Sequence, residues 1–146
     1  MLYSKIIITL LNFLDYFQQK KIIKLINSKF SKPIVVLDIG AHYGETIKLF
    51  LNKLKIQKIY SFEPSPYNFQ VLKKNISKYQ PNKVEIFNFG LGEKISKKYI
   101  NQTVESSSST INKINKDSKY LKRKLKILNI KDKDTFYHKL PIEVST

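Results

Sequence analysis

The sequence predicts an α/β fold, a Rossmann-like parallel sheet with flanking helices, and three observations lead to this prediction. Short apolar runs alternate with longer amphipathic segments between residues 33 and 92. Each apolar run is followed by a loop that carries acidic, glycine or proline residues. Hydrophobic residues make up 42% of the 146 residues, which is enough to form a core. This alternating order of strands and helices implies right-handed crossovers and therefore parallel strands.

The first 30 residues are expected to form an N-terminal amphipathic helical segment, and residues 31–146 an incomplete Rossmann-like domain. Within residues 3–27, hydrophobic side chains recur at helical spacing. They are Ile7, Leu10, Leu11, Leu14, Phe17, Ile22, Leu25 and Ile26. An amphipathic helix is the ordinary surface element of a domain, so we interpret this segment as a helix packed on the domain. The alternative is a weak contact with a membrane surface through the same residues.

Three strands and two helices are expected in the next part of the chain. They are a strand at 34–37, a helix at 45–54, a strand at 58–62, a helix from 65 to 79 and a strand at 84–88. The first strand is a continuous run of apolar and β-branched residues, which is typical of a buried parallel strand. Ser65 and Pro66 match the N-cap and the first residue of the second helix. On the first helix, the face expected to lie against the sheet contains Ile47, Phe50, Leu51 and Leu54.

The pattern of strands and helices becomes weaker after Gly92. We expect a short strand at 97–100, a polar loop at 104–110, a partly helical segment at 111–133 and another strand at 136–144. No helix follows the last of these segments to close the unit. We therefore expect a chain that lacks the C-terminal part of the sheet. Such a chain would have an exposed sheet edge and an uncovered apolar face.

The chain carries a formal net charge of +16, from 27 basic and 11 acidic residues. A charge of this size suggests nucleic acid or an anionic surface as a partner. However, every basic residue except Arg123 is a lysine, whereas nucleic-acid sites rely on arginine for bidentate contacts. The sequence therefore makes no strong case for nucleic acid. A basic binding module for nucleic acid or an anionic surface remains an alternative.

The absence of cysteine excludes disulfides and thiolate metal sites, and no metal site is predicted. It also agrees with a cytoplasmic location. No segment reaches the ~18–20 apolar residues that a membrane span requires. Residues 6–14 come nearest, but no small-residue cleavage site of a secretory signal follows them.

The first loop at the expected carboxyl edge of the sheet reads Asp38-x-Gly40-x-x-x-Gly44. Ligands of open parallel sheets bind at this edge, and glycine lets the backbone approach them closely. The G-x-G-x-x-G spacing of dinucleotide sites and the G-K-[ST] of phosphate loops are both absent. A carboxylate repels pyrophosphate but suits a ligand with an ammonium and a sulfonium group. The alternatives are an NAD- or nucleotide-dependent enzyme, and an acid that only caps the turn.

The second and third loops carry residue types that can bind a nucleoside. Glu63 ends the second strand, 25 residues after Asp38, where a carboxylate can accept hydrogen bonds from both ribose hydroxyls. Alternatively, Glu63 is an exposed acid that is stabilised by its position near the N-terminus of the following helix. Residues 88–92 can offer backbone groups to an adenine edge, and Phe89 or Leu91 can pack on the ring.

These segments resemble the FkbM family of class I S-adenosylmethionine-dependent methyltransferases. Residues 36–46, VLDIGAHYGET, are similar to motif I of class I methyltransferases. Residues 59–66, IYSFEPSP, are similar to the FkbM family in particular, and the resemblance extends over residues 30–146. Further similar positions are Asn68, Phe69, Leu72, Asn75, Asn88, Leu91, Gly92, residues 105–110 and residues 142–146. Members of the family continue beyond the last of these segments into further strands, which agrees with a truncated chain.

The resemblance implies S-adenosylmethionine as the cofactor and O-methylation of a hydroxyl on a sugar, a glycan or another small molecule. The residues expected to bind the cofactor are Asp38, Gly40, Ala41, Gly44, Glu63, Pro64, Asn88 and Leu91. By analogy with the family, residues 38–44 would line the methionine part, Glu63 the ribose and residues 88–92 the adenine. Because the sheet is expected to be incomplete, a fragment without catalytic activity is a further alternative.

No catalytic base is assigned from the sequence. Glu105 and His138 are candidates by residue type alone. His42 stands where the family usually has asparagine, and the sequence identifies no carboxylate partner for it. We therefore interpret His42 as a polar loop residue.

Overall fold

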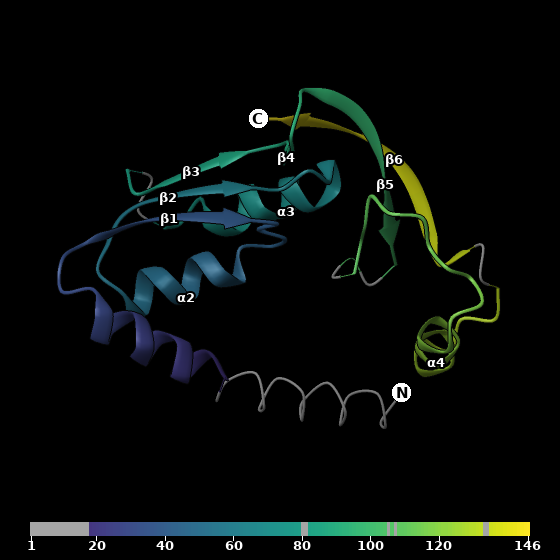
Figure 1. Cartoon of the computed structure of the whole chain (residues 1–146), viewed down its shortest axis with the longest axis horizontal. Helices are drawn as coiled ribbons and strands as arrows, with labels where there is room; N and C mark the ends of the chain where they lie inside the picture. Colours follow the sequence, from purple (N-terminus) through teal and green to yellow (C-terminus); the bar gives the residue numbers. More distant parts are fainter. Residues whose placement is uncertain (1–17, 80–81, 105, 107, 133–134) are drawn as a thin grey trace.

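Two sheets form the framework of the protein (Figure 1). The computed structural model describes residues 18–79, 82–104, 106, 108–132 and 135–146. The first sheet is parallel and has the strand order β1-β2-β3, whereas the second has the order β4-β6-β5. Helices α2 and α3 pack against the first sheet. The predicted α/β fold with a parallel sheet and flanking helices is confirmed.

The first sheet contains the predicted alternation of strands and helices. Its elements are β1 (Ile34–Ile39), α2 (Glu45–Lys53), β2 (Ile56–Phe62), α3 (Pro66–Ile76) and β3 (Val84–Phe87). The bounds agree with the predicted ones or differ from them by at most three residues. The largest difference is at the end of α3, which stops at Ile76 rather than Tyr79. The predicted cap is confirmed, because Ser65 accepts a hydrogen bond from Asn68 N with Pro66 at the start of the helix.

The core of the protein lies between this sheet and its two helices. Ile47 of α2, Ile59 of β2 and Leu72 of α3 are fully buried there. Phe50, Leu51 and Leu54 pack against the same cluster, which confirms the helix face predicted from their spacing. Because strands β1 to β3 follow one another in a single direction, right-handed crossovers place both helices on the same face of the sheet.

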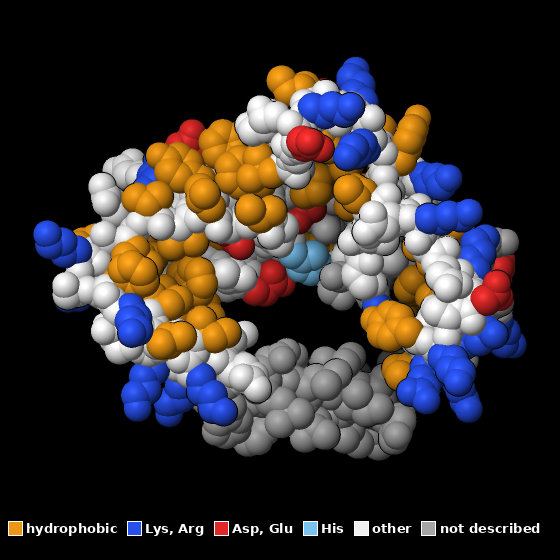
Figure 2. Space-filling view, in the orientation of Figure 1, with side chains coloured by type: hydrophobic (Ala, Val, Ile, Leu, Met, Phe, Trp, Pro, Cys, Tyr) orange, Lys and Arg blue, Asp and Glu red, His pale blue; other side chains and the backbone are white. Residues whose placement is uncertain are grey.

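The opposite face of the first sheet is uncovered. Val35, Leu37 and Ile39 of β1 are 53%, 64% and 67% exposed. Figure 2 shows hydrophobic side chains gathered over this sheet. The prediction of a buried strand is therefore wrong for one face of β1, because no described helix packs on that side. The predicted uncovered apolar face is present.

The second sheet contains β4 (Gly90–Leu91), β5 (Ser96–Thr103) and β6 (Tyr137–Ser145), and α4 (Lys119–Leu128) lies in the connection between β5 and β6. Strand β6 runs parallel to β4 and antiparallel to β5. The predicted strand at 136–144 and the partial helix within 111–133 are confirmed, and the short strand at 97–100 is longer than predicted. Residues 88–92 were expected to form only a loop. This is wrong for Gly90 and Leu91, which pair with residues of β6 that come more than 50 positions later.

Only part of the predicted N-terminal helical segment lies among the described residues. Residues 18–29 are helical, and Asn27 Nδ2 donates to the Lys53 carbonyl at the end of α2 at 3.2 Å. Residues 3–17 of the predicted helix lie outside the described residues. Within the described part of the chain, no helix has both the length and the apolar character needed to cross a membrane. The division of the chain at residue 30 stays a prediction.

Candidate functional site

The three loops predicted to meet do lie at one edge of the first sheet. Because β1, β2 and β3 are parallel, their carboxyl ends share that edge. Backbone hydrogen bonds join the loops directly: Gly40 N and Ala41 N donate to Phe62 O at 2.8 and 3.1 Å. Glu63 N donates to Phe87 O at 3.0 Å. Asp38 and Glu63 therefore stand at the ends of neighbouring strands, as the sequence predicted.

Asp38 is the second-last residue of β1 and lies opposite Ser61 of β2. The Ser61 hydroxyl donates to Asp38 Oδ2 at 3.3 Å. Burial is the strongest influence on the pKa of Asp38 and raises it; the bond from Ser61 opposes this change, and the negative charge of Glu45 adds to it. Among the described residues, no basic side chain forms an ion pair with Asp38. This carboxylate is therefore placed to hold a cationic group of a ligand.

The two glycines of the first loop serve different purposes. Both have left-handed backbone, with φ of +85° at Gly40 and +88° at Gly44. A Cβ at Gly40 would meet no atom within 4 Å, so the space beside this residue is open. A Cβ at Gly44 would lie 2.9 Å from Leu72 Cδ1, so a larger residue there would collide with α3. Gly40 thus leaves room for a ligand, whereas Gly44 is required by packing.

Ala41, another residue predicted to bind the cofactor, belongs to the core. Its exposed fraction is 3%, and it packs in the same cluster as Ile47 and Leu72. Its backbone N–H is already bonded to Phe62 O. The position of Ala41 therefore explains how the loop is anchored to the sheet, while its contact with a cofactor stays a prediction.

Glu63 is almost fully buried, with an exposed fraction of 4%, and three protein groups donate to its carboxylate. His42 N donates to Oε2 at 2.8 Å, while Ser65 N and Asn68 Nδ2 donate to Oε1 at 2.9 and 3.5 Å. Burial raises the pKa of Glu63, and these three hydrogen bonds and the nearby His42 oppose the change. Glu63 ties the loop after β1 to the start of α3. Its predicted contact with a ribose remains untested.

The third loop is joined to the second through Asn88. Its side-chain amide donates to Glu63 O at 2.8 Å and to Pro64 O at 3.4 Å. Pro64 and Asn88 also line a hollow of about 300 Å³ that β5 and β6 close from the other side. Leu91 lies further along, in β4 opposite Ser145, and is 37% exposed. The predicted adenine contacts of these residues stay predictions.

A row of buried polar side chains extends from Glu63 toward the second sheet. Asn68 Oδ1 accepts a hydrogen bond from Gln102 Nε2 of β5 at 3.4 Å. Gln102 is 9% exposed, and its Oε1 atom is buried without a hydrogen-bond partner among the described residues. Buried acceptors are normally satisfied by protein, water or a ligand. Gln102 Oε1 is therefore an acceptor to which a bound molecule or water can donate.

His42 makes contacts that the sequence did not reveal. Its ring Nε2 lies 2.7 Å from the Ser106 hydroxyl, and its Nδ1 lies 3.5 Å from Glu45 Oε1. Ser106 Oγ donates to the Tyr43 hydroxyl at 2.9 Å, and the Tyr43 ring stacks on His42 with 3.8 Å between centroids. Ser106 follows β5, so these contacts connect the loop after β1 with the second sheet. Figure 2 shows acidic side chains and a histidine gathered between the two sheets.

One part of this cluster could have been found in the sequence, and one part could not. His42 and Glu45 are three residues apart at the start of a predicted helix, where side chains at that spacing lie close together. The premise that His42 has no carboxylate partner is therefore wrong, whereas its predicted place in a loop is confirmed. Ser106 is 64 positions away from His42, and no local pattern predicts that contact. Of the other two base candidates, Glu105 lies outside the described residues, and His138 is exposed on β6.

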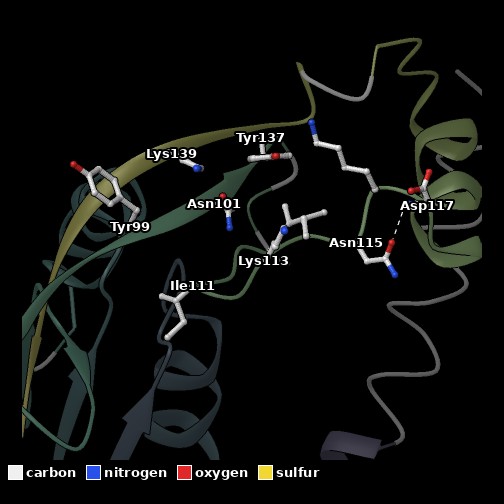
Figure 3. A pocket seen from close by; sticks show the side chains of 10 residues that line it. Tyr99, Asn101, Ile111, Lys113, Asn115, Asp117, Tyr137 and Lys139 are labelled. Atoms are coloured by element: carbon white, nitrogen blue, oxygen red, sulfur yellow. Dashed lines mark hydrogen bonds between the residues drawn. The ribbon is translucent and has the colours of Figure 1, made fainter.

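A hollow of about 750 Å³ lies elsewhere, against the second sheet (Figure 3). Tyr99, Asn101, Tyr137 and Lys139 of β5 and β6 line it together with Lys113 and other residues of the segment before α4. None of the residues predicted to bind a cofactor lines this hollow. Size alone does not select the site, because a cationic ligand requires a group of opposite charge.

The residues present at the sheet edge fit an adenosyl cofactor that carries an amino acid part. Asp38 supplies a carboxylate without an ion-pair partner in the described chain. Two residues later in the loop, a Cβ added at Gly40 would meet no atom within 4 Å. Glu63 stands one strand away, and Gln102 Oε1 is a buried acceptor that lacks a donor. Among the described residues, no group of histidine and acidic side chains is suited to a metal ion.

Comparisons with known proteins find little that is similar. No family model matches the chain, and no curated protein matches it. A solved structure, methyltransferase FkbM from Methylobacillus flagellatus KT, is similar over 47% of this chain and 20% of that chain. The two are 23% identical, with a TM-score of 0.41. The matched part of the chain thus spans about a fifth of that protein.

Proposed function

We propose that the chain binds S-adenosylmethionine at residues 38–44 and serves the transfer of its methyl group to a hydroxyl of a small molecule or glycan. The observation that carries this proposal is the Asp38 carboxylate, which has no ion-pair partner in the described chain and belongs to the residue two positions before Gly40, where an added Cβ would meet no atom within 4 Å. The cofactor brings an ammonium and a sulfonium group, whose charges are opposite to that of Asp38. The motif resemblance at residues 36–46 and 59–66 supports the same choice of ligand.

The two acids have different tasks in this proposal. Asp38 binds the amino group of the methionine part through a charge-assisted hydrogen bond. A carboxylate has about four acceptor positions, and three donors of the protein already use the carboxylate of Glu63. Glu63 therefore has capacity for about one ribose hydroxyl rather than two, and its main task is to hold the loop in place.

The reaction places few chemical demands on the protein. The bound cofactor supplies a methyl group on a sulfonium, and the displacement is in line. The chain must therefore align the acceptor hydroxyl with that methyl group and take up the proton that the hydroxyl loses. Residues 38–44 lie on the cofactor side of this arrangement. Ser106 contacts His42 of this loop, and Gln102 of β5 contacts Asn68 of α3.

A calorimetric titration of S-adenosylmethionine tests the proposal with the wild type, Asp38→Asn and Glu85→Gln. Glu85 is the matched control, because it is an acid of β3 whose ion pair with Lys58 is on another part of the sheet. Removing the charge at Asp38 should weaken binding by about 1.5–3 kcal/mol, which is about tenfold to a hundredfold. Glu85→Gln should bind like the wild type. Equal affinity of the wild type and Asp38→Asn, or no binding by the wild type, would contradict the proposal.

A further inference from the structure

Tyr43, Ser106 and His42 form a continuous chain of hydrogen-bonding groups at the candidate site. Ser106 Oγ lies 2.9 Å from the Tyr43 hydroxyl and 2.7 Å from His42 Nε2. The other ring nitrogen of His42 lies 3.5 Å from Glu45 Oε1. The chain thus runs from a phenol through an alcohol to an imidazole, and it ends at a carboxylate. This order is suited to moving a proton toward the histidine.

Burial decides which end of this chain a second molecule can reach. Ser106 is 6% exposed, and both ring nitrogens of His42 face groups of the protein. Tyr43 is partly exposed, and its hydroxyl stands at the opposite end of the chain from Glu45, whose side chain is 64% exposed. Tyr43 also lies within residues 38–44, the loop in which we place the cofactor. An acceptor hydroxyl that lies near the methyl group can therefore contact Tyr43 but not Ser106.

The directions of the hydrogen bonds are reversible, as a proton relay requires. In the structure Ser106 donates to Tyr43, so the single Ser106 proton is used and His42 Nε2 must donate to Ser106. The other ring nitrogen, Nδ1, lies 3.5 Å from Glu45 Oε1. With both bonds reversed, Tyr43 donates to Ser106 and Ser106 donates to Nε2. In the relay, the bonds run from Tyr43 to His42 before a proton is taken up and in the opposite direction afterwards.

We propose that Tyr43 accepts the proton of the acceptor hydroxyl and that Ser106 relays a proton from Tyr43 to His42. This inference rests on the proposed methyl transfer and names its proton path. The acceptor O–H bond breaks and a proton reaches Tyr43 Oη, while the proton of Tyr43 moves to Ser106 and that of Ser106 moves to Nε2. The acceptor oxygen forms its bond to the methyl carbon as the carbon–sulfur bond breaks, and the electron pair stays on sulfur. The positive charge of the sulfonium is replaced by that of the imidazolium.

The residues of the relay have distinct roles. Tyr43 is the catalytic residue, because it contacts the acceptor. Ser106 and His42 act through Tyr43 and are positioning and relay residues, while Glu45 stabilises the charged imidazole by its opposite charge. Ser106 has a left-handed backbone with φ of +58°, which is uncommon for a residue other than glycine. Its unusual backbone brings a side chain of the second sheet to the loop of the first.

Nitrogen-15 NMR of the histidine rings tests the relay without any turnover. The chain has two histidines, His42 and His138, so His138 is an internal control. Tyr43→Phe keeps the ring that stacks on His42 but removes the hydroxyl, and Tyr67→Phe is the matched control at an exposed tyrosine. We expect Tyr43→Phe to shift the His42 Nε2 resonance and leave His138 unchanged, with no shift at either ring in Tyr67→Phe. An unchanged His42 resonance in Tyr43→Phe would overturn the relay.

Methyl transfer from tritium-labelled S-adenosylmethionine to a panel of methyl glycosides and simple polyols provides the second readout. We expect kcat to fall about 10²–10⁴-fold in Tyr43→Phe, Ser106→Ala and His42→Gln, the range of general base catalysis. Cofactor affinity should stay within about twofold, because none of these side chains is assigned to the cofactor. His138→Gln and Tyr67→Phe should retain the wild-type rate.

The two proposals fail in different ways in this experiment. If the wild type does not bind the cofactor, the proposed function is wrong and the relay with it. If the cofactor binds but Tyr43→Phe transfers methyl groups as fast as the wild type, only the relay is overturned. A wild type that binds the cofactor and methylates none of the acceptors also overturns the relay as a catalytic path.

Discussion

The carboxyl ends of β1 and β2 each carry an acid, but the surroundings of the two acids differ. Glu63, after β2, is 4% exposed and accepts three hydrogen bonds from the protein. Asp38, at the end of β1, accepts one bond of 3.3 Å from Ser61. The carboxylate of Glu63 is largely used to hold the site together, whereas that of Asp38 remains available to a ligand. Neighbouring acids of one sheet edge can thus divide structural and binding tasks.

Replacing each acid by alanine should separate these tasks most clearly. Glu63→Ala leaves the N–H groups of His42 and Ser65 and the amide of Asn68 without an acceptor, at a cost of about 1–3 kcal/mol in the free energy of unfolding. Asp38→Ala removes a single long bond and should cost less than about 1 kcal/mol. Urea denaturation of the two variants beside the wild type measures the difference. Equal destabilisation of the two variants would contradict the different structural tasks of Glu63 and Asp38.

The pH dependence of stability should also distinguish Asp38 from Glu63, with a smaller effect than the alanine substitutions. The pKa of Asp38 is raised above its ordinary value of 3.8, so its ionised form is disfavoured in the folded chain. The stability that this group contributes is present below pH 3.8 and is lost as the pH rises through the raised value. Asp38→Asn removes this loss. It should melt at a higher temperature than the wild type at pH 7.

The advantage of Asp38→Asn should shrink as the pH falls toward 3.8, because the wild-type carboxyl becomes protonated in both the folded and the unfolded state. Thermal melts of the two proteins at several pH values measure this. A difference in melting temperature that is independent of pH would show that the charge of Asp38 is not its cause. If Asp38→Asn is more stable than the wild type but binds the cofactor more weakly, the Asp38 carboxylate lowers the stability of the chain and strengthens binding.

Local signals account for what the sequence predicted correctly. Apolar runs and helical spacing identified β1, β2, β3, α2 and α3, and the pair Ser65-Pro66 identified the start of α3. The parallel order of the strands then placed Asp38 and Glu63 at one edge. Each of these inferences depends on residues that are close together in the chain, or on a rule that all parallel sheets obey.

Contacts between distant parts of the chain could not be predicted in this way. Strand β4 has two residues and exists because β6 pairs with it, so residues 88–92 had the local pattern of a loop. The contact of His42 with Ser106 depends on how the second sheet meets the first. An uncovered apolar face was predicted, but its place on β1 was missed for a related reason: an apolar run indicates a strand, but not which of its faces another element covers.

Mapping the bound cofactor by NMR distinguishes two positions for the ligand. We propose that it lies at the edge of the first sheet rather than in the larger hollow of the second. Adding S-adenosylmethionine to the nitrogen-15-labelled chain should shift the backbone amide resonances of Gly40, His42 and Glu63 most strongly. Shifts concentrated at Asn101, Lys113 and the other residues that line the hollow in Figure 3, or no shifts at all, would contradict the account.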